Sequence, residues 1–139
     1  MVPAKWMSAI LAWIISCSSG ALANDPTLTL THLTGALYLV EDSHYTKTNS
    51  AVYVGTSSVT VIGATWTPDT AALLARQIKA VTDRPIREVI DTSPDPEWSG
   101  GNAYWRSIGA RVIAANVTCS FLKVKWDETV SGIQKFFPT

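Results

Sequence analysis

The stretch that decides the fold reads Val61-Ile62-Gly63-Ala64-Thr65-Trp66-Thr67-Pro68-Asp69-Thr70-Ala71, and within it the chain changes from strand to helix. Thr67 is a good N-cap, Pro68 suits the first helical position, and Asp69 favours the positive end of a helix. One apolar stripe at helical spacing follows, formed by Ala71, Leu74, Ile78 and Val81. We therefore expect a helix from about Pro68 to Thr82, which Pro85 prevents from continuing.

Before this stretch the pattern is that of short strands. Thr27–Thr31 alternates threonine with leucine, and Ala36–Val40 follows a break at Gly35. Ala51–Val54 and Val59–Ile62 are short β-branched runs, and residues 55–58 between them are typical of a hairpin turn. The first third of the chain is therefore predicted to be an antiparallel β meander.

Strands and helices alternate after the predicted helix. We expect a strand at Ile86–Ile90, a polar loop at Asp91–Ser99, a short helix at Asn102–Ile108, a strand at Arg111–Ala115 and a helix at Val124–Phe136. A meander followed by such βαβα alternation indicates an α/β or α+β fold with layered helices.

Composition limits the function classes without naming one. The 139 residues sum to 15.0 kDa, and eleven basic side chains balance eleven acidic ones. A nucleic-acid binder would show a basic excess, so we expect no nucleic-acid partner. With 47% hydrophobic residues the chain is too apolar for a disordered protein.

The first residues have the layout of a secretory signal peptide. Lys5 is followed by an apolar run from Trp6 to Ile15, and Ala21-Leu22-Ala23 is a small-x-small cleavage site. The run is too short to span a bilayer, which needs about 20 residues. We expect residues 1–23 to be removed, leaving a secreted domain over residues 24–139 that has no membrane segment.

Secretion would expose two further residues, Cys119 and Asn116, to disulfide formation or glycosylation. Cys119 is the one cysteine left after cleavage, so it forms no intrachain disulfide; a buried thiol and an intermolecular bridge both remain open. Asn116-Val117-Thr118 is a glycosylation sequon, which makes Asn116 a candidate glycosylation site in a host that glycosylates.

Acidic residues gather in the loop after the Ile86–Ile90 strand. In α/β sheets, ligands bind beyond the carboxyl ends of the strands, which is where this loop lies. Pro94 and Pro96 are expected to hold the segment extended, so that Ser93, Asp95 and Glu97 project to a similar side. Two such carboxylates suit a hard cation or acid–base work. A solvated acidic loop ahead of a helix is the alternative.

Several motifs, in order, resemble the metallo-β-lactamase superfamily, most closely its mono-zinc, carbapenem-hydrolysing subclass. Besides residues 61–71, they are Gly35-Ala36-Leu37-Tyr38-Leu39-Val40-Glu41-Asp42, Asn49-Ser50, Gly100-Gly101-Asn102-Ala103-Tyr104-Trp105 and Ser107-Ile108-Gly109-Ala110. The resemblance covers nearly all of residues 24–139. It implies the N-terminal half of an αββα sandwich, the remaining half being absent from this chain.

The resemblance also shows where the chain departs from the family. That subclass has an Asn-x-His-x-Asp-Arg motif in the acidic loop, and here Ser93, Asp95, Glu97 and Trp98 stand at those positions. A catalytic zinc needs about three protein ligands plus water, and this loop offers oxygen donors alone. We therefore expect that zinc, the cofactor of the family, is not retained and that no metal is bound.

The histidines lie outside that motif. His32 falls in the first predicted strand and is interpreted as structural. His44 lies in the Glu41–Asn49 loop, which in the family borders the active site, and a lone histidine in a polar loop is more often exposed than a ligand.

Three functions remain open. By resemblance, the chain is related to hydrolases that open lactam rings, with a role in lactam or xenobiotic detoxification and no activity as this truncated chain. The alternative is a secreted, non-catalytic binding or interaction protein that holds a small lactam-like ligand. The third is metal-free hydrolysis, with Asp95 and Glu97 as an acid–base pair.

The half fold also predicts an exposed surface. In the full family fold two sheets bury their apolar faces against each other, so half of it leaves one sheet face uncovered. Soluble monomers rarely expose large apolar patches. We therefore expect a marginal monomer, a homodimer or pairing with a complementary half.

Overall fold

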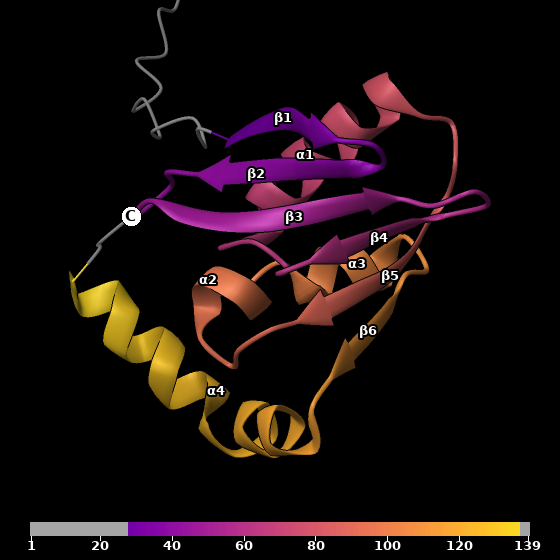
Figure 1. Ribbon diagram of the computed structural model, residues 1–139. Helices are drawn as coiled ribbons and strands as arrows, with labels where there is room; N and C mark the ends of the chain where they lie inside the picture. Colours follow the sequence, from indigo (N-terminus) through magenta and orange to yellow (C-terminus); the bar gives the residue numbers. More distant parts are fainter. Residues whose placement is uncertain (1–27, 137–139) are drawn as a thin grey trace, which may run out of the picture.

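The computed structural model describes residues 28–136, so the predicted signal peptide lies outside the described residues. A six-stranded mixed sheet forms the centre, and its strands follow chain order from one edge to the other (Figure 1). They are β1 (Leu28–Thr34), β2 (Leu37–Asp42), β3 (Thr48–Val54), β4 (Val59–Ile62), β5 (Ile86–Asp91) and β6 (Arg111–Ala114). Strands β1 to β4 pair antiparallel, whereas β4, β5 and β6 pair parallel. The predicted meander followed by alternating strands and helices is confirmed.

Four helices complete the fold. They are α1 (Pro68–Val81), α2 (Pro96–Ser99), α3 (Asn102–Ser107) and α4 (Asn116–Phe136). In Figure 1, α1 and α3 lie behind the sheet, and α4 extends along one side of the molecule. Among residues 28–136, no helix is long and apolar enough to cross a membrane.

The core lies between the sheet and α1 and α3. Alternate residues of the central strands, including Val52, Val61 and Val89, are fully buried against Leu74 of α1 and Trp105 of α3. Alternation of this kind follows from the period of two in a strand, which sends successive side chains to opposite faces. One face of the sheet is therefore packed by helices.

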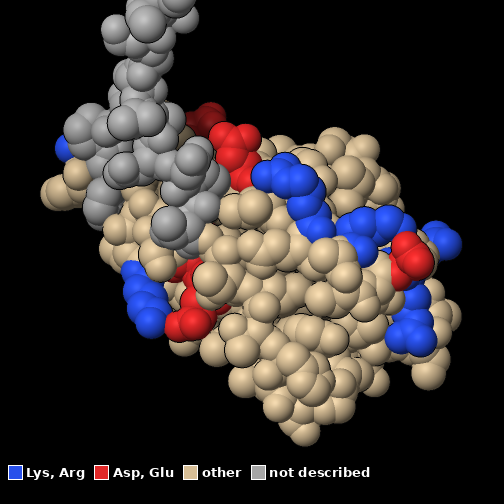
Figure 2. Space-filling view, turned by 90° about the horizontal axis from the view of Figure 1, so that it is seen from above, with Lys and Arg blue, Asp and Glu red and all other residues tan. Residues whose placement is uncertain are grey.

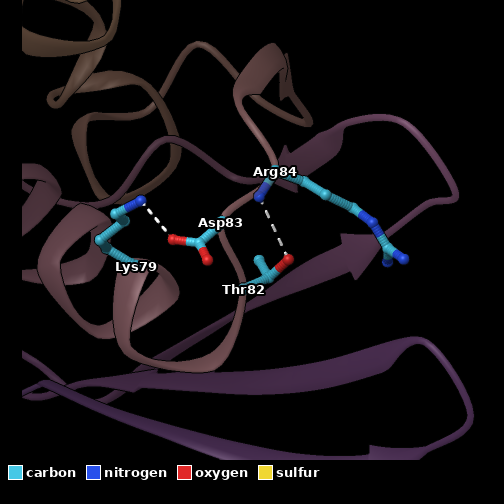
Figure 3. A network of polar contacts seen from close by, with 4 residues as sticks. All are labelled: Lys79, Thr82, Asp83 and Arg84. Atoms are coloured by element: carbon cyan, nitrogen blue, oxygen red, sulfur yellow. Dashed lines mark hydrogen bonds and ion pairs between the residues drawn. The ribbon is translucent and has the colours of Figure 1, made fainter.

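Helix α1 begins and ends as its sequence predicts. The Thr67 hydroxyl accepts a 3.1 Å hydrogen bond from the Thr70 N–H, and the Thr67 N–H donates one of 3.0 Å to the Thr70 hydroxyl. At the other end, the Arg84 N–H donates to the Thr82 hydroxyl at 3.2 Å, and Lys79 pairs with Asp83 at 2.5 Å (Figure 3). The two contacts at the N-terminus form a reciprocal cap and satisfy an N–H group that a helix leaves unpaired there.

Three predictions of local structure are wrong. The segment Asp91–Ser99 is not a loop throughout, because Asp91 is the last residue of β5 and Pro96–Ser99 forms α2. Proline at the first turn of a helix is favourable, so Pro96 begins a helix and does not hold the chain extended. The last helix begins at Asn116 and not at Val124.

Charged side chains are mixed on the surface seen in Figure 2. Lys and Arg gather mainly toward the end away from the grey trace, with an acidic side chain among them, and most of the face carries neither charge. This mixture agrees with the balanced composition.

Candidate functional site

Strands β2, β4, β5 and β6 all end at one edge of the sheet. The antiparallel and parallel pairings give these four strands the same direction. The segment from Thr92 to α2 therefore lies beside residues 63–66, which follow β4, and near Asp42, which ends β2. Carboxyl ends of strands are the common ligand-binding edge of such sheets, and we take this edge as the candidate site.

Ser93 and Asp95 are brought together, whereas Glu97 is not joined to them. The Ser93 hydroxyl donates a 2.5 Å hydrogen bond to Oδ2 of Asp95, and the Asp95 N–H donates one of 3.3 Å to the same hydroxyl. Asp95 is exposed and precedes α2, and Glu97 lies in the first turn of that helix. The Asp95 carboxylate therefore lies on an extended residue, whereas the Glu97 carboxylate lies on a helix.

Trp98 lies across the carboxyl edge of the sheet. Its ring is so close to Gly63 that an added Cβ there would lie 3.0 Å from Trp98 Cδ1 and 2.5 Å from Ser50 Oγ. Its indole N–H donates a 3.3 Å hydrogen bond to the carbonyl of Asn49, and its own carbonyl accepts one of 2.7 Å from the Ala64 N–H. Trp98 thus packs against β3 and the β4–α1 turn, and its indole remains half-exposed.

The β4–α1 turn fixes α2 and α3 through backbone contacts. The Gly101 N–H donates to the Thr65 carbonyl at 3.0 Å, and an added Cβ at Gly101 would lie 2.0 Å from the Ala64 carbonyl. Thr65 holds a left-handed backbone, with φ 71°, and its hydroxyl accepts a 3.0 Å hydrogen bond from Thr70. A β-branched residue in this region is strained and persists because its surroundings hold it.

Two buried carboxylates at this edge were not singled out by the sequence. Asp91 is 4% exposed, and its Oδ2 accepts a 2.7 Å hydrogen bond from the Asn102 side chain, while Oδ1 has no partner among the described residues. Burial raises the pKa of Asp91 to about 6, against the opposing effects of the Asn102 hydrogen bond and the Arg106 charge. The signal was available, since an acid that ends a buried strand points inward if it keeps the alternation of that strand.

Asp42 is the second buried carboxylate. Its Oδ1 accepts a 3.0 Å hydrogen bond from the His44 N–H, and its Oδ2 is buried without a partner among the described residues. Burial raises the pKa of Asp42, although the His44 N–H and other nearby donors act in the opposite direction. Strand β2 places this acid on the helix-covered face, because Asp42 lies two residues after the fully buried Val40.

The histidines and the cysteine stand apart from the acidic loop. His32 interacts with the Gly35 carbonyl through Nε2 at 3.0 Å and with the ring of Tyr38, a structural role. His44 is half-buried beside Asp42 and Tyr45, and not fully exposed as expected. Cys119 is half-buried, with Sγ 3.8 Å from the Ala114 carbonyl, and Asn116 is exposed at the start of α4.

The donor set at this edge does not fit a catalytic zinc. Such a site joins about three imidazole, thiolate or carboxylate ligands around one position. Ser93, Asp95 and Glu97 supply oxygen donors alone, and Asp95 is hydrogen-bonded to Ser93. Over residues 28–136, no three His, Cys, Asp or Glu side chains gather in a way that could hold a metal ion.

The solved structures that resemble this fold include FIM-1 and TMB-1. FIM-1 from Pseudomonas aeruginosa, a metallo-β-lactamase in its mono-zinc form, matches with a TM-score of 0.63 and 18% identity, over 69% of this chain and 45% of FIM-1. The fold is metallo-β-lactamase-like. TMB-1 matches with a TM-score of 0.65 and 15% identity, over 73% of this chain and 49% of TMB-1. No family model matches the sequence.

The metallo-β-lactamase-like fold predicted from the motifs is thereby confirmed. The chain matches about half the length of each of these two proteins. Likeness at such low identity extends to the fold and not to chemistry. What this metallo-β-lactamase-like chain does must therefore be argued from its own residues.

Proposed function

We propose that this protein is a secreted relative of the hydrolases that open lactam rings, with a role in lactam or xenobiotic detoxification, and that this chain alone does not hydrolyse lactams through zinc. The observation that carries the proposal is the replacement of the metal-binding side chains within a retained scaffold. Ser93 and Asp95 are hydrogen-bonded to each other, and Glu97 lies on α2. The scaffold is lactamase-like, while the groups that would activate water with a metal are changed.

A non-catalytic binding role is the second candidate, and Trp98 favours it. The half-exposed indole lies at the edge where ligands bind in sheets of this kind. Its N–H is engaged with Asn49, which fixes the ring in place. A fixed aromatic face suits stacking with a flat, lactam-like ring, because little conformational freedom is lost on binding.

The test is hydrolysis of a chromogenic cephalosporin and of a carbapenem by the purified chain. It is run with added zinc, without it, and with a chelator. We expect no zinc-dependent turnover, and turnover that zinc restores would overturn the proposal. Hydrolysis that survives the chelator and is lost in Glu97→Gln would instead establish the Asp95–Glu97 acid–base pair.

Binding is measured separately by titrating tryptophan fluorescence with the same two lactams in the presence of chelator. If the lactam ring stacks on Trp98, the dissociation constant obtained from saturable quenching of the remaining tryptophans should rise at least tenfold in Trp98→Ala. Trp126→Ala is the matched control, since Trp126 lies on α4. Equal effects of the two substitutions would exclude Trp98 as the contact residue.

A further inference from the structure

One face of the sheet carries an apolar row that crosses five strands in register. Leu39 of β2 pairs with Ala51 of β3, which pairs with Ile62 of β4. Ile62 pairs in turn with Ile90 of β5, and Ile90 with Ile113 of β6. All five side chains are half-buried, and they alternate with the core residues that face α1 and α3. The described helices leave this face of the sheet open (Figure 1).

Polar residues border the apolar row on both sides. One neighbouring row contains Glu41 and Asn49. The other contains Thr60, Glu88 and Arg111 on β4 to β6, and continues through Tyr53 of β3 to Leu37 of β2. An apolar centre with a polar rim is the usual anatomy of a protein interface.

The charges of this rim are paired within one copy of the chain. Glu41 forms an ion pair with Lys47, and Glu88 forms one with Arg111. Two such faces can therefore approach each other without a net electrostatic repulsion.

The row is complementary to itself. A two-fold axis that runs parallel to the strands and past Ile62 reverses the order of the strands in a second copy. Leu39 then lies opposite Ile113 of that copy, Ala51 opposite Ile90, and Ile62 opposite its own equivalent. The two sheets then lie at the usual face-to-face spacing of about 10 Å.

The size of the face suits a second copy of the chain. Five strands at about 4.8 Å spacing, with three rows of side chains, bury about 1,000–1,300 Å² in total when two faces meet, which reaches the lower end of specific interfaces. FIM-1 and TMB-1 each match this chain over about half of their own length. We propose that the open face binds a second copy of this chain, in a symmetric dimer centred on Ile62. This proposal does not depend on the proposed function.

The first test is the mass of the purified chain in solution, measured by sedimentation equilibrium from 1 to 100 μM. We expect twice the mass of the chain for the unaltered protein, and a dimer dissociation constant at least tenfold weaker for Ile62→Lys, which brings two charges together on the axis. Val124→Lys is the matched control, because Val124 is 77% exposed on α4, and it should leave the dimer intact. A monomer throughout this range, or a dimer that Ile62→Lys leaves unchanged, overturns the proposal.

The second test addresses geometry and does not rely on one variant. Ala51→Lys and Ile90→Glu should each be monomeric, and circular dichroism checks that both are folded. Mixed in equal amounts, they should form a heterodimer, because the introduced ammonium group of one copy then meets the introduced carboxylate of the other. Two folded monomers that do not associate on mixing overturn this arrangement, and would mean that another segment or partner covers the face.

Discussion

The side chain of Asn102 donates a 2.7 Å hydrogen bond to Oδ2 of Asp91 inside the carboxyl edge of the sheet. Oδ1 of Asp91 and Oδ1 of Asn102 are both buried and have no partner among the described residues. Two acceptors without a donor lose their hydration on burial and regain nothing. The protonated acid has a donor to offer, and this agrees with the raised pKa of Asp91, about 6.

Asp91→Asn should stabilise the protein at pH 7. The native state holds the Asp91 proton up to about pH 6, whereas an unfolded aspartate releases it near 3.8. Because the native state binds more protons in that window, stability contributed by this group falls as pH rises from about 4 to 6. An asparagine supplies a neutral donor, and we expect a gain of about 1–3 kcal/mol at pH 7 with a smaller pH slope. Urea unfolding at pH 4.5 and 7 measures both.

Asp83→Asn is the control for this prediction. Asp83 is exposed and paired with Lys79 (Figure 3), and this pairing lowers its pKa. We expect little change in the free energy of unfolding at pH 7. Asp42 remains in both variants and keeps a residual slope of the same sign as that of Asp91, because burial raises its pKa too. An Asp91→Asn protein that is less stable than the parent at pH 7 would contradict the prediction.

Local signals account for the elements that the sequence predicts well. Helix α1 has its N-cap, its first-turn proline and its apolar stripe within residues 67–81, so no distant contact is needed to recognise it. Helix α2 was not predicted because it has four residues, too few for a periodic pattern. The first turns of α4 were not predicted because their side chains are mostly exposed and form no apolar stripe.

The candidate site depends on contacts that sequence spacing does not encode. Trp98 and its acceptor Asn49 lie 49 positions apart, and Asp91 and Asn102 lie 11 apart on different elements. The acidic loop was visible as a cluster of charges. Asp91 is its buried acid because it lies two residues after the buried Val89 and so shares the helix-covered face of β5.

Gly101→Ala should be strongly destabilising. A methyl group there would lie 2.0 Å from the Ala64 carbonyl and 2.9 Å from the Ala71 side chain, so the β4–α1 turn has to move. We expect a loss of at least about 2 kcal/mol, measured by urea unfolding. Gly132→Ala is the matched control within helix α4, since nothing lies within 4 Å of an added methyl group. It should raise stability by up to about 1 kcal/mol, and similar losses in both variants would contradict the steric explanation.

Trp98→Ala should loosen the acidic loop. The ring lies against Gly63, and removal of both the ring and its N–H takes away the side-chain anchor of α2 on β3. Amide hydrogen exchange over residues 92–100 should become at least tenfold faster, since local opening then costs less. Trp98→Phe keeps an aromatic ring but loses the indole N–H, and should give an intermediate exchange rate. Exchange that is unchanged in Trp98→Ala would mean that the backbone bond from Ala64 to the Trp98 carbonyl is a sufficient anchor.

Trp105→Phe should cost stability through a single hydrogen bond. Trp105 is fully buried, and its indole N–H donates a 2.9 Å hydrogen bond to the carbonyl of Ala64. Phenylalanine keeps most of the packing but leaves that buried carbonyl without this donor, which costs about 1–3 kcal/mol. Trp126→Phe is the control, because the half-buried Trp126 side chain makes no hydrogen bond to the described residues. Equal stability changes in the two variants, by chemical denaturation, would show that lost ring volume and not the Ala64 contact sets the cost.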